Sequence, residues 1–145
     1  MKRITYILLA VSIIFSTCKK TEDKNEFSIT LIEMNPTEII EFEENINVRI
    51  SYSHNQGFVG FLDPDYLSLE IKDSRLSKPD YYHLIPLSPP QSEVSIMGEI
   101  LIEIDAPFIF GNGNTETLTF TIRIQDKDKN WSNKITTDLI TVNKQ

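Results

Sequence analysis

The chain has 145 residues, and its 14 Lys and Arg against 21 Asp and Glu give a formal charge of −7 at neutral pH. A net negative surface repels nucleic acid and anionic lipid head groups, so nucleic acid is excluded as an expected partner. The length suits one domain with a substantial core. The single cysteine excludes a disulfide within the chain.

Residues 1–17 have the layout of a bacterial export signal. Two basic residues precede an uncharged, mostly apolar run over residues 4–15, and two small residues then stand directly before Cys18. This end resembles a lipobox, the sequence at which bacterial lipoproteins are cleaved and acylated. A transmembrane helix would need about 20 apolar residues, whereas residues 4–17 number fourteen. We therefore expect a cleaved signal peptide over residues 1–17 and lipid attachment at Cys18; the alternative is an ordinary signal peptide with a chance cysteine.

Cleavage after residue 17 would remove two basic residues and no acidic ones, which leaves 12 Lys and Arg against 21 Asp and Glu, a charge of −9. With Cys18 acylated, no thiol remains for catalysis. Residues 19–26 contain no apolar side chain, so residues 18–26 are predicted to form a lipidated, disordered tether. Its eight residues after the cysteine reach at most about 28 Å. The domain is therefore expected to stay close to the bilayer.

Beyond the tether, apolar and polar residues alternate with a period of two, which is typical of half-buried strands. The alternation predicts seven strands, over residues 27–31, 46–52, 67–72, 81–85, 99–104, 117–125 and 135–142, the first ending before Pro36 and the last with a bulge near Asp138. Residues 37–44 have a helix-like composition but are too few to form a stable helix without packing. The pattern predicts an all-β fold for residues 27–145, a seven-stranded immunoglobulin-like antiparallel β-sandwich without the inter-sheet disulfide.

Three stretches, residues 66–85, 98–100 and 120–135, resemble a widespread family of small Bacteroidota lipoproteins. The matching positions are Asp73, Arg75, Tyr82, Ile85, Pro86, Gly98, Glu99, Ile100, Asp126, Asn130, Ser132 and Asn133. These motifs are structural rather than catalytic, and the family has no assigned activity. The resemblance implies a lipid-anchored envelope protein, which we expect at the outer membrane. The membrane face stays open, because the acidic residues associated with surface export in that group follow two lysines here.

The chain departs from that family at two loops. An Asp- and Gly-rich loop after the second strand, which would invite a cation, is replaced here by residues 53–60 without a carboxylate. In the final hairpin Lys129 stands at the usual Gly position, so a positive φ in that turn is expected to fall to Asn130.

Asp126, Asp128 and Asn130 are weak candidates for a metal site, because their D-x-D-x-N spacing is that of the start of a calcium loop. An EF-hand-type loop also needs Gly at its sixth position and Glu at its twelfth, where this chain has Trp131 and Thr137. The alternative is a hairpin turn whose Asp and Asn side chains bond local backbone amides. We therefore expect neither a metal nor another cofactor.

Aromatic residues mark one predicted end of the sandwich. Phe58, Phe61 and Trp131 fall in loops that gather at the same end of an immunoglobulin-like fold, together with the loop over residues 87–92. Exposed aromatic side chains on loops hold sugars or peptides in many such domains. The alternative, which we favour, is that these rings fold back and plug the end of the sandwich. The tether is expected to enter at this same end.

No catalytic motif is apparent. His54 and His83 have no acidic or hydroxyl partner at a recognisable spacing, and Ser132 lacks the flanking glycines of a nucleophile elbow. The sequence therefore predicts a lipid-anchored, non-enzymatic binding or structural module of the cell envelope, with a protein or glycan partner. The alternatives are a lipoprotein that captures glycans through the aromatic end and a hydrolase with a triad built from distant residues.

Overall fold

A computed structural model of the chain describes residues 27–57, 59–87 and 94–145. Within these residues the fold is all-β, as predicted, and no helix is present that could cross a membrane. The signal sequence, Cys18, the tether and Phe58 lie outside the described residues. The described strands are β1 (Phe27–Asn35), β2 (Glu38–Ile40), β3 (Ile46–His54), β4 (Leu69–Asp73), β5 (Asp80–Tyr82), β6 (Ile96–Ile104), β7 (Thr115–Leu118), β8 (Phe120–Ile124), β9 (Ile135–Thr136) and β10 (Ile140–Asn143).

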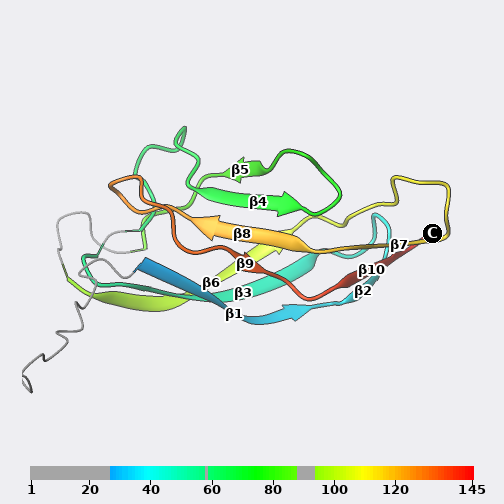
Figure 1. Cartoon of the computed structure of the whole chain (residues 1–145), viewed down its shortest axis with the longest axis horizontal. Helices are drawn as coiled ribbons and strands as arrows, with labels where there is room; N and C mark the ends of the chain where they lie inside the picture. Colours follow the sequence, from blue (N-terminus) through cyan, green and yellow to red (C-terminus); the bar gives the residue numbers. More distant parts are fainter. Residues whose placement is uncertain (1–26, 58, 88–93) are drawn as a thin grey trace, which may run out of the picture.

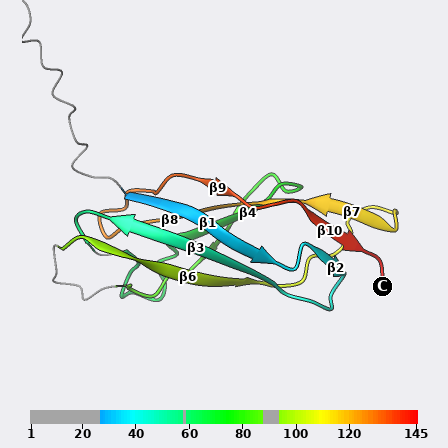
Figure 2. The ribbon, with the colours of Figure 1, turned by 90° about the horizontal axis from the view of Figure 1, so that it is seen from below.

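The described strands form three sheets. One has the order β1-β3-β6, the second β5-β4-β8-β9 and the third β2-β10-β7. All pairs are antiparallel except β2 and β10, which run parallel. The second and third sheets are joined twice by the chain, because β7 leads to β8 across Thr119 and β9 leads to β10. Figure 1 shows β5, β4 and β8 along one side of the elongated molecule, and Figure 2 shows β1, β3 and β6 side by side.

The predicted inward faces are confirmed where the alternation is strongest. On β3 the side chains of Ile46, Val48 and Ile50 are fully buried, and on β10 Ile140 and Val142 are too. These β-branched residues favour the extended backbone and pack well on a pleated surface. With the buried side chains of β8, they form one core shared by the sheets.

The predicted number of strands was wrong, because two long runs are each divided and Glu38–Ile40 form an additional short strand, β2. Residues 117–125 form β7 and β8, and residues 135–142 form β9 and β10. The division occurs where Thr137 lies opposite Phe120. The Thr137 hydroxyl accepts a hydrogen bond from the Phe120 amide at 2.9 Å, and the Thr137 amide donates to the Phe120 carbonyl. A side chain thus replaces one partner of the regular ladder near the predicted bulge.

Three further differences concern the early part of the chain. Residues 37–44 contain the short strand β2 and a turn in which Phe42 has a φ of 65°. The parallel pairing of β2 with β10 corrects the prediction of purely antiparallel sheets. Leu67, predicted to face inward, is exposed, and the strand begins only at Leu69. The predicted end of β1 before Pro36 is confirmed.

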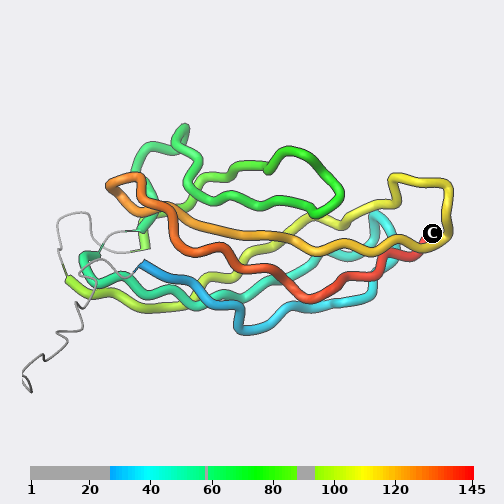
Figure 3. Tube along the Cα trace, viewed as in Figure 1, coloured from blue at the N-terminus to red at the C-terminus, as the bar shows by residue number. Residues whose placement is uncertain are grey.

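The two long sides of the fold differ in how they are closed. On one side Asn133, just before β9, bonds both backbone groups of Ile29: its Oδ1 accepts from the Ile29 amide at 2.8 Å and its Nδ2 donates to the Ile29 carbonyl at 3.0 Å. This amide ties β1 to the other layer. On the opposite side β6 and β5 are the last strands of their sheets. Figure 3 shows that the start of β1 and the C-terminus lie at opposite ends of the long axis.

Candidate functional site

A cavity of about 620 Å³ lies on the side of the fold where β5 and β6 are the outermost strands. Its floor includes core side chains of β4 and β8, among them Ile71 and Phe120, and its walls include Tyr82 from β5 and Ile100 and Ile104 from β6. We call this cavity the groove. It is an apolar recess between the edges of two sheets, of the size that holds an apolar ligand or a few side chains of a partner.

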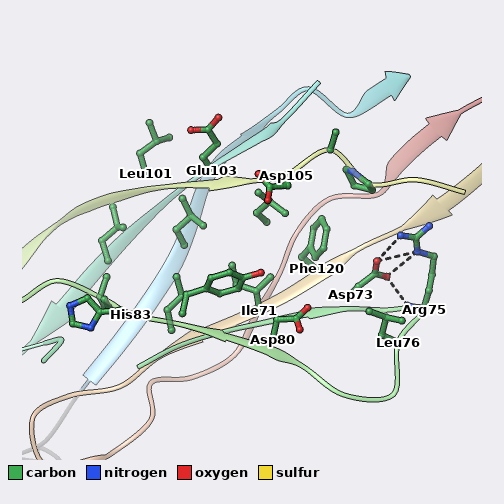
Figure 4. A pocket seen from close by; sticks show the side chains of 18 of the residues that line it. Ile71, Asp73, Arg75, Leu76, Asp80, His83, Leu101, Glu103, Asp105 and Phe120 are labelled. Atoms are coloured by element: carbon green, nitrogen blue, oxygen red, sulfur yellow. Dashed lines mark hydrogen bonds and ion pairs between the residues drawn. The ribbon is translucent and has the colours of Figure 1, made fainter. Parts of the chain in front are cut away.

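Acidic side chains stand along the groove. Asp80 begins β5, Glu103 lies on β6 and Asp105 follows β6 directly, and all three are exposed. Among the described residues no Lys or Arg forms an ion pair with any of them. Figure 4 shows Asp105 on one wall and Asp80 on the other, with Ile71 and Phe120 between them.

Carboxylates on both walls of the groove affect the pKa of the Tyr82 hydroxyl group. Partial burial of the phenol is the main cause that raises its pKa above the usual value of 10.0, and the nearby charges of Asp80 and Asp105 raise it further. Both carboxylates therefore act on the same point of the groove. The groove thus combines an apolar floor with a negative electrostatic potential.

The arginine that lines the groove is already neutralised. Arg75 donates from Nε and Nη2 to the carboxylate of Asp73, with a shortest distance of 2.7 Å. Its Nη1 donates to the Phe108 carbonyl at 2.8 Å and lies 3.5 Å from a Glu116 oxygen. Asp73 and Arg75, which stand two positions apart in the sequence, thus form a two-point ion pair that holds the chain in place at one end of the groove.

An exposed aromatic cluster adjoins this ion pair. Phe108 stacks on Phe42 with ring centroids 5.3 Å apart and meets Phe110 edge-on at 5.0 Å. The Arg75 guanidinium lies 4.1 Å from the centre of the Phe110 ring. The rings are 65%, 44% and 45% exposed for Phe42, Phe108 and Phe110. This cluster was not predicted from the sequence, where the available signal was a pair of aromatic residues, Phe108 and Phe110, in a segment without a strand pattern.

The loops that carry Phe61 and Trp131 meet at one end of the fold, as predicted, but the two rings pack on different partners. The loops meet there, because Val59 bridges Asp126 and the Gly60 amide bonds the Gln125 carbonyl. Phe61 packs on Tyr66 with centroids 3.8 Å apart, whereas Trp131 lies 4.3 Å from the guanidinium of Arg123. No ring contact joins these two aromatic residues within the described chain.

The hairpin at Asp126 has the hydrogen bonds of a turn. Asp126 Oδ1 accepts from the backbone amides of Asp128 and Asn130, each at 2.8 Å, and its Oδ2 accepts from the Asn130 side chain at 3.0 Å. No cluster of three or more metal-ligating acidic, His or Cys side chains occurs among the described residues. The carboxylate therefore holds the hairpin together in the way that the turn alternative describes.

The residue with positive φ in this hairpin is Lys129, at 67°, and not Asn130 as predicted. Its backbone is held from both sides, because its amide donates to the Asp126 carbonyl at 3.0 Å and its carbonyl accepts from the Gln125 side chain at 2.7 Å. These two hydrogen bonds hold Lys129 in a conformation that residues with a Cβ rarely adopt.

A buried pair that sequence spacing missed joins His54 to Asp126, with 3.3 Å between Nε2 and Oδ2. His54 Nδ1 accepts a hydrogen bond from the Gln56 amide at 3.0 Å, so Nε2 carries the proton that is donated to Asp126. Neither ring nitrogen is left to act as a base. Ser132 is also occupied, because its hydroxyl accepts from the Ile124 amide and donates to the Asn133 carbonyl.

No family model, curated protein or solved structure matches the chain. Among the sites built by described residues, the His54 pair and the Asp126 hairpin have their polar atoms bonded within the fold. The groove instead presents apolar surface and exposed carboxylates. It is therefore the candidate functional site.

Proposed function

We propose that this chain is a lipid-anchored, non-enzymatic module of the bacterial cell envelope that binds a partner in the groove between β5 and β6. The observation that carries the proposal is the groove itself, an apolar recess of about 620 Å³ between two sheet edges, with acidic walls and an aromatic cluster at one end. Apolar surface with a few placed charges is the usual composition of a binding site. Such a surface supports binding without requiring a nucleophile or a base.

The sequence supports the anchor and the location. Residues 1–17 followed by Cys18 have the lipoprotein layout, and the likeness to Bacteroidota lipoproteins points to the outer membrane. The domain begins at Phe27, whose ring lies 4.8 Å from that of His54, at the end that carries the Asp126 hairpin. Figure 1 shows β1 starting at the end of the molecule opposite the loops that contain Phe42 and Phe108. An anchored domain would then hold the exposed cluster of Phe42, Phe108 and Phe110, at one end of the groove, away from the bilayer.

The strand order favours an immunoglobulin-like sandwich as the framework. The sheet β1-β3-β6 lies against β5-β4-β8-β9, and the edge strand β2 runs parallel to the last strand, β10. In this interpretation the first strand of the sandwich is divided, with β1 in one layer and β2 in the other. Its open side leaves β5 and β6 accessible to a partner.

Photocrosslinking from the groove tests the proposal. The full chain would be produced with p-benzoylphenylalanine in place of Tyr82, and in a matched control in place of Thr136, which is exposed on β9 outside the groove. Irradiation of intact cells is expected to give discrete adducts from position 82 and none from position 136. Absence of any adduct at position 82, with both proteins folded and membrane-bound, would overturn the proposed function.

A further inference from the structure

We propose that the groove binds an extended segment of a partner protein in which basic and apolar residues alternate, and that this segment adds as a strand to the outer edge of β6. This inference rests on the proposed function and names the chemistry of the partner. It follows from three features of the structure: an unpaired strand edge, an apolar floor beside it and carboxylates on both walls.

The edge of β6 is long and unpaired. Its nine residues pair with β3 without interruption, from Ile96 opposite His54 to Ile104 opposite Ile46. Among the described residues no strand pairs with its other edge. Such an edge presents a row of backbone N–H and C=O groups that an extended chain can pair with. Nine residues offer about 30 Å of edge at about 3.3 Å per residue.

On the closed side of the fold, the backbone groups at the edge of β1 are partly bonded by a side chain. There, the side chain of Asn133 pairs with both backbone groups of Ile29 on β1. No equivalent side-chain cap on β6 is present among the described residues. The edge of β6 therefore differs from that of β1 in being accessible beside a groove.

The side chains of β6 specify an alternating partner. Ile102 is buried and Ile100 and Ile104 are half-buried where they line the groove, whereas Glu99, Leu101 and Glu103 alternate with them and are exposed. Of these exposed residues, Leu101 and Glu103 also line the groove. A strand added to β6 would place every second side chain over the apolar floor and the others beside these glutamates. Opposite charges across neighbouring strands are favourable by roughly 0.2–1 kcal/mol per pair. The outward side chains of the partner are thus expected to be Lys or Arg.

The acidic charge is available to a partner. Arg49 reaches Glu99 at 3.8 Å, but no cation pairs with Glu103, Asp80 or Asp105 among the described residues. Arg75 is neutralised by Asp73. The groove is therefore negative on both walls, which attracts a basic segment and repels a fatty acid carboxylate.

A second copy of this chain fits the same edge less well. Antiparallel pairing of two β6 strands in the register centred on Leu101 would place Glu99 of each copy opposite Glu103 of the other, and like charges opposite each other destabilise a sheet. An acyl chain would fill the apolar floor but would use neither the backbone edge nor the carboxylates. Both occupants are outcomes that the following experiment distinguishes.

The test uses the purified full chain in nanodiscs of zwitterionic lipid, with empty nanodiscs subtracted. Three fluorescent nine-residue peptides are compared by anisotropy: one alternating Lys and Val, one alternating Glu and Val, and the Lys–Val peptide with every backbone amide methylated. We expect the Lys–Val peptide to bind at least tenfold more tightly than either of the others, because the first control reverses the charge and the second removes backbone donors.

Two protein variants locate the site. The double variant Asp80→Asn and Asp105→Asn is expected to weaken Lys–Val binding at least threefold, whereas Asp128→Asn with Asp138→Asn, which removes the same charge from exposed positions outside the groove, should leave it unchanged. Equal binding of all three peptides, or equal loss in both double variants, would overturn the inference. Dimerisation that peptide does not reverse, or preferential binding of a dodecyl probe, would overturn it in favour of a second copy or a lipid.

Photocrosslinking separates this inference from the proposed function. Adducts of protein mass from position 82, together with Lys–Val binding, support both proposals. Adducts without any Lys–Val binding leave the groove as a binding site but overturn the basic strand. Absence of adducts overturns the proposed function itself.

Discussion

Gly60 lies where the loop after β3 passes beside the segment that follows β5. Its φ of +91° is a conformation that glycine adopts at little cost. A Cβ at this position would lie 2.7 Å from the Leu84 carbonyl oxygen and 2.8 Å from that of Ile85. We predict that Gly60→Ala destabilises the fold by about 2 kcal/mol, measured by thermal unfolding of the full chain. Gly111→Ala is the matched control, because a Cβ there meets nothing within 4 Å; equal losses in both variants would contradict this account.

The backbone of Lys129 is strained in the final hairpin, because its φ of 67° is unfavourable for a residue with a Cβ. We predict that Lys129→Gly is more stable than Lys129→Ala by about 1 kcal/mol. Both changes remove the Lys129 ammonium, which lies 5.2 Å from the centre of the Tyr66 ring, so their difference isolates the backbone. Comparable unfolding temperatures for the two variants would show that the turn is not strained.

Glu70 provides a pH-dependent contribution to stability. Burial on its own raises the pKa of this carboxyl, but hydrogen bonds from Arg123 and Tyr81 and the charge of Arg123 outweigh burial and lower the pKa below its usual 4.5. Arg123 donates to both carboxylate oxygens, at 2.8 and 2.6 Å. Because the folded pKa is the lower one, the contribution is complete above the unfolded value and is lost as the pH falls through the folded value.

We therefore predict that Glu70→Gln lowers the free energy of unfolding by about 2 kcal/mol at pH 7 and that this loss shrinks steadily below pH 4.5. Thermal unfolding of both proteins over that range measures it. Glu44→Gln, at an exposed position, is the control and should change stability little at any pH. A deficit in Glu70→Gln that persists unchanged in acid would contradict the assigned role of the carboxylate.

At the scale of residues, contacts between near neighbours in the sequence could be predicted, and contacts between distant residues could not. Asp126 could be interpreted as a turn residue because its partners Asp128 and Asn130 follow within four positions. Its bond to His54, 72 residues away, leaves no trace in local spacing. The positive φ of Lys129 was missed because propensity favours Asn130, and the hydrogen bonds that override it come from Gln125 and Asp126.

At the scale of elements, Asn133 is the feature that closes one side of the fold. Its side chain takes the place of a neighbouring strand at Ile29. We predict that Asn133→Ala costs about 2 kcal/mol, since two hydrogen bonds are lost, and that the Ile29 amide then exchanges faster with solvent. Asn112→Ala, in an exposed loop, is the control. Unchanged exchange at Ile29 in the Asn133 variant would show that β1 is held by its pairing with β3 alone.

The strands themselves were largely predictable, because period-two alternation depends only on which face is buried. The inward residues of β3, β8 and β10 follow this rule without exception. What alternation cannot supply is the partner of each strand. The parallel pairing of β2 with β10 and the division at Thr137 depend on tertiary contacts that no local pattern encodes.

At the scale of the whole molecule, the proposed lipid anchor at Cys18 would determine where the groove acts. We predict that Cys18→Ala releases the full chain from the membrane fraction, because acylation requires the thiol. Cell fractionation with immunodetection measures the distribution. A change of a neighbouring tether residue, Thr21→Ala, should leave the chain membrane-bound. Retention of the Cys18 variant in the membrane fraction would contradict the anchoring proposal.

The groove could not have been predicted from the sequence. Its residues come from four strands, β4, β5, β6 and β8, and from the segments that follow β4, β5 and β6, and locally they resemble ordinary core or surface positions. The recess lies where no described strand joins β5 to β6, which is a property of the strand order. The sequence directed attention instead to Phe61 and Trp131, whose rings pack on Tyr66 and Arg123.

We propose above that the chain binds its partner through the groove between β5 and β6. Amide hydrogen exchange tests it most directly, by comparing the full chain in its native membranes with the purified, partner-free chain in nanodiscs. We predict slower exchange in native membranes over β5 and β6, with no change in the hairpin over residues 126–131. Protection confined to that hairpin, or identical exchange in the two preparations, would contradict it.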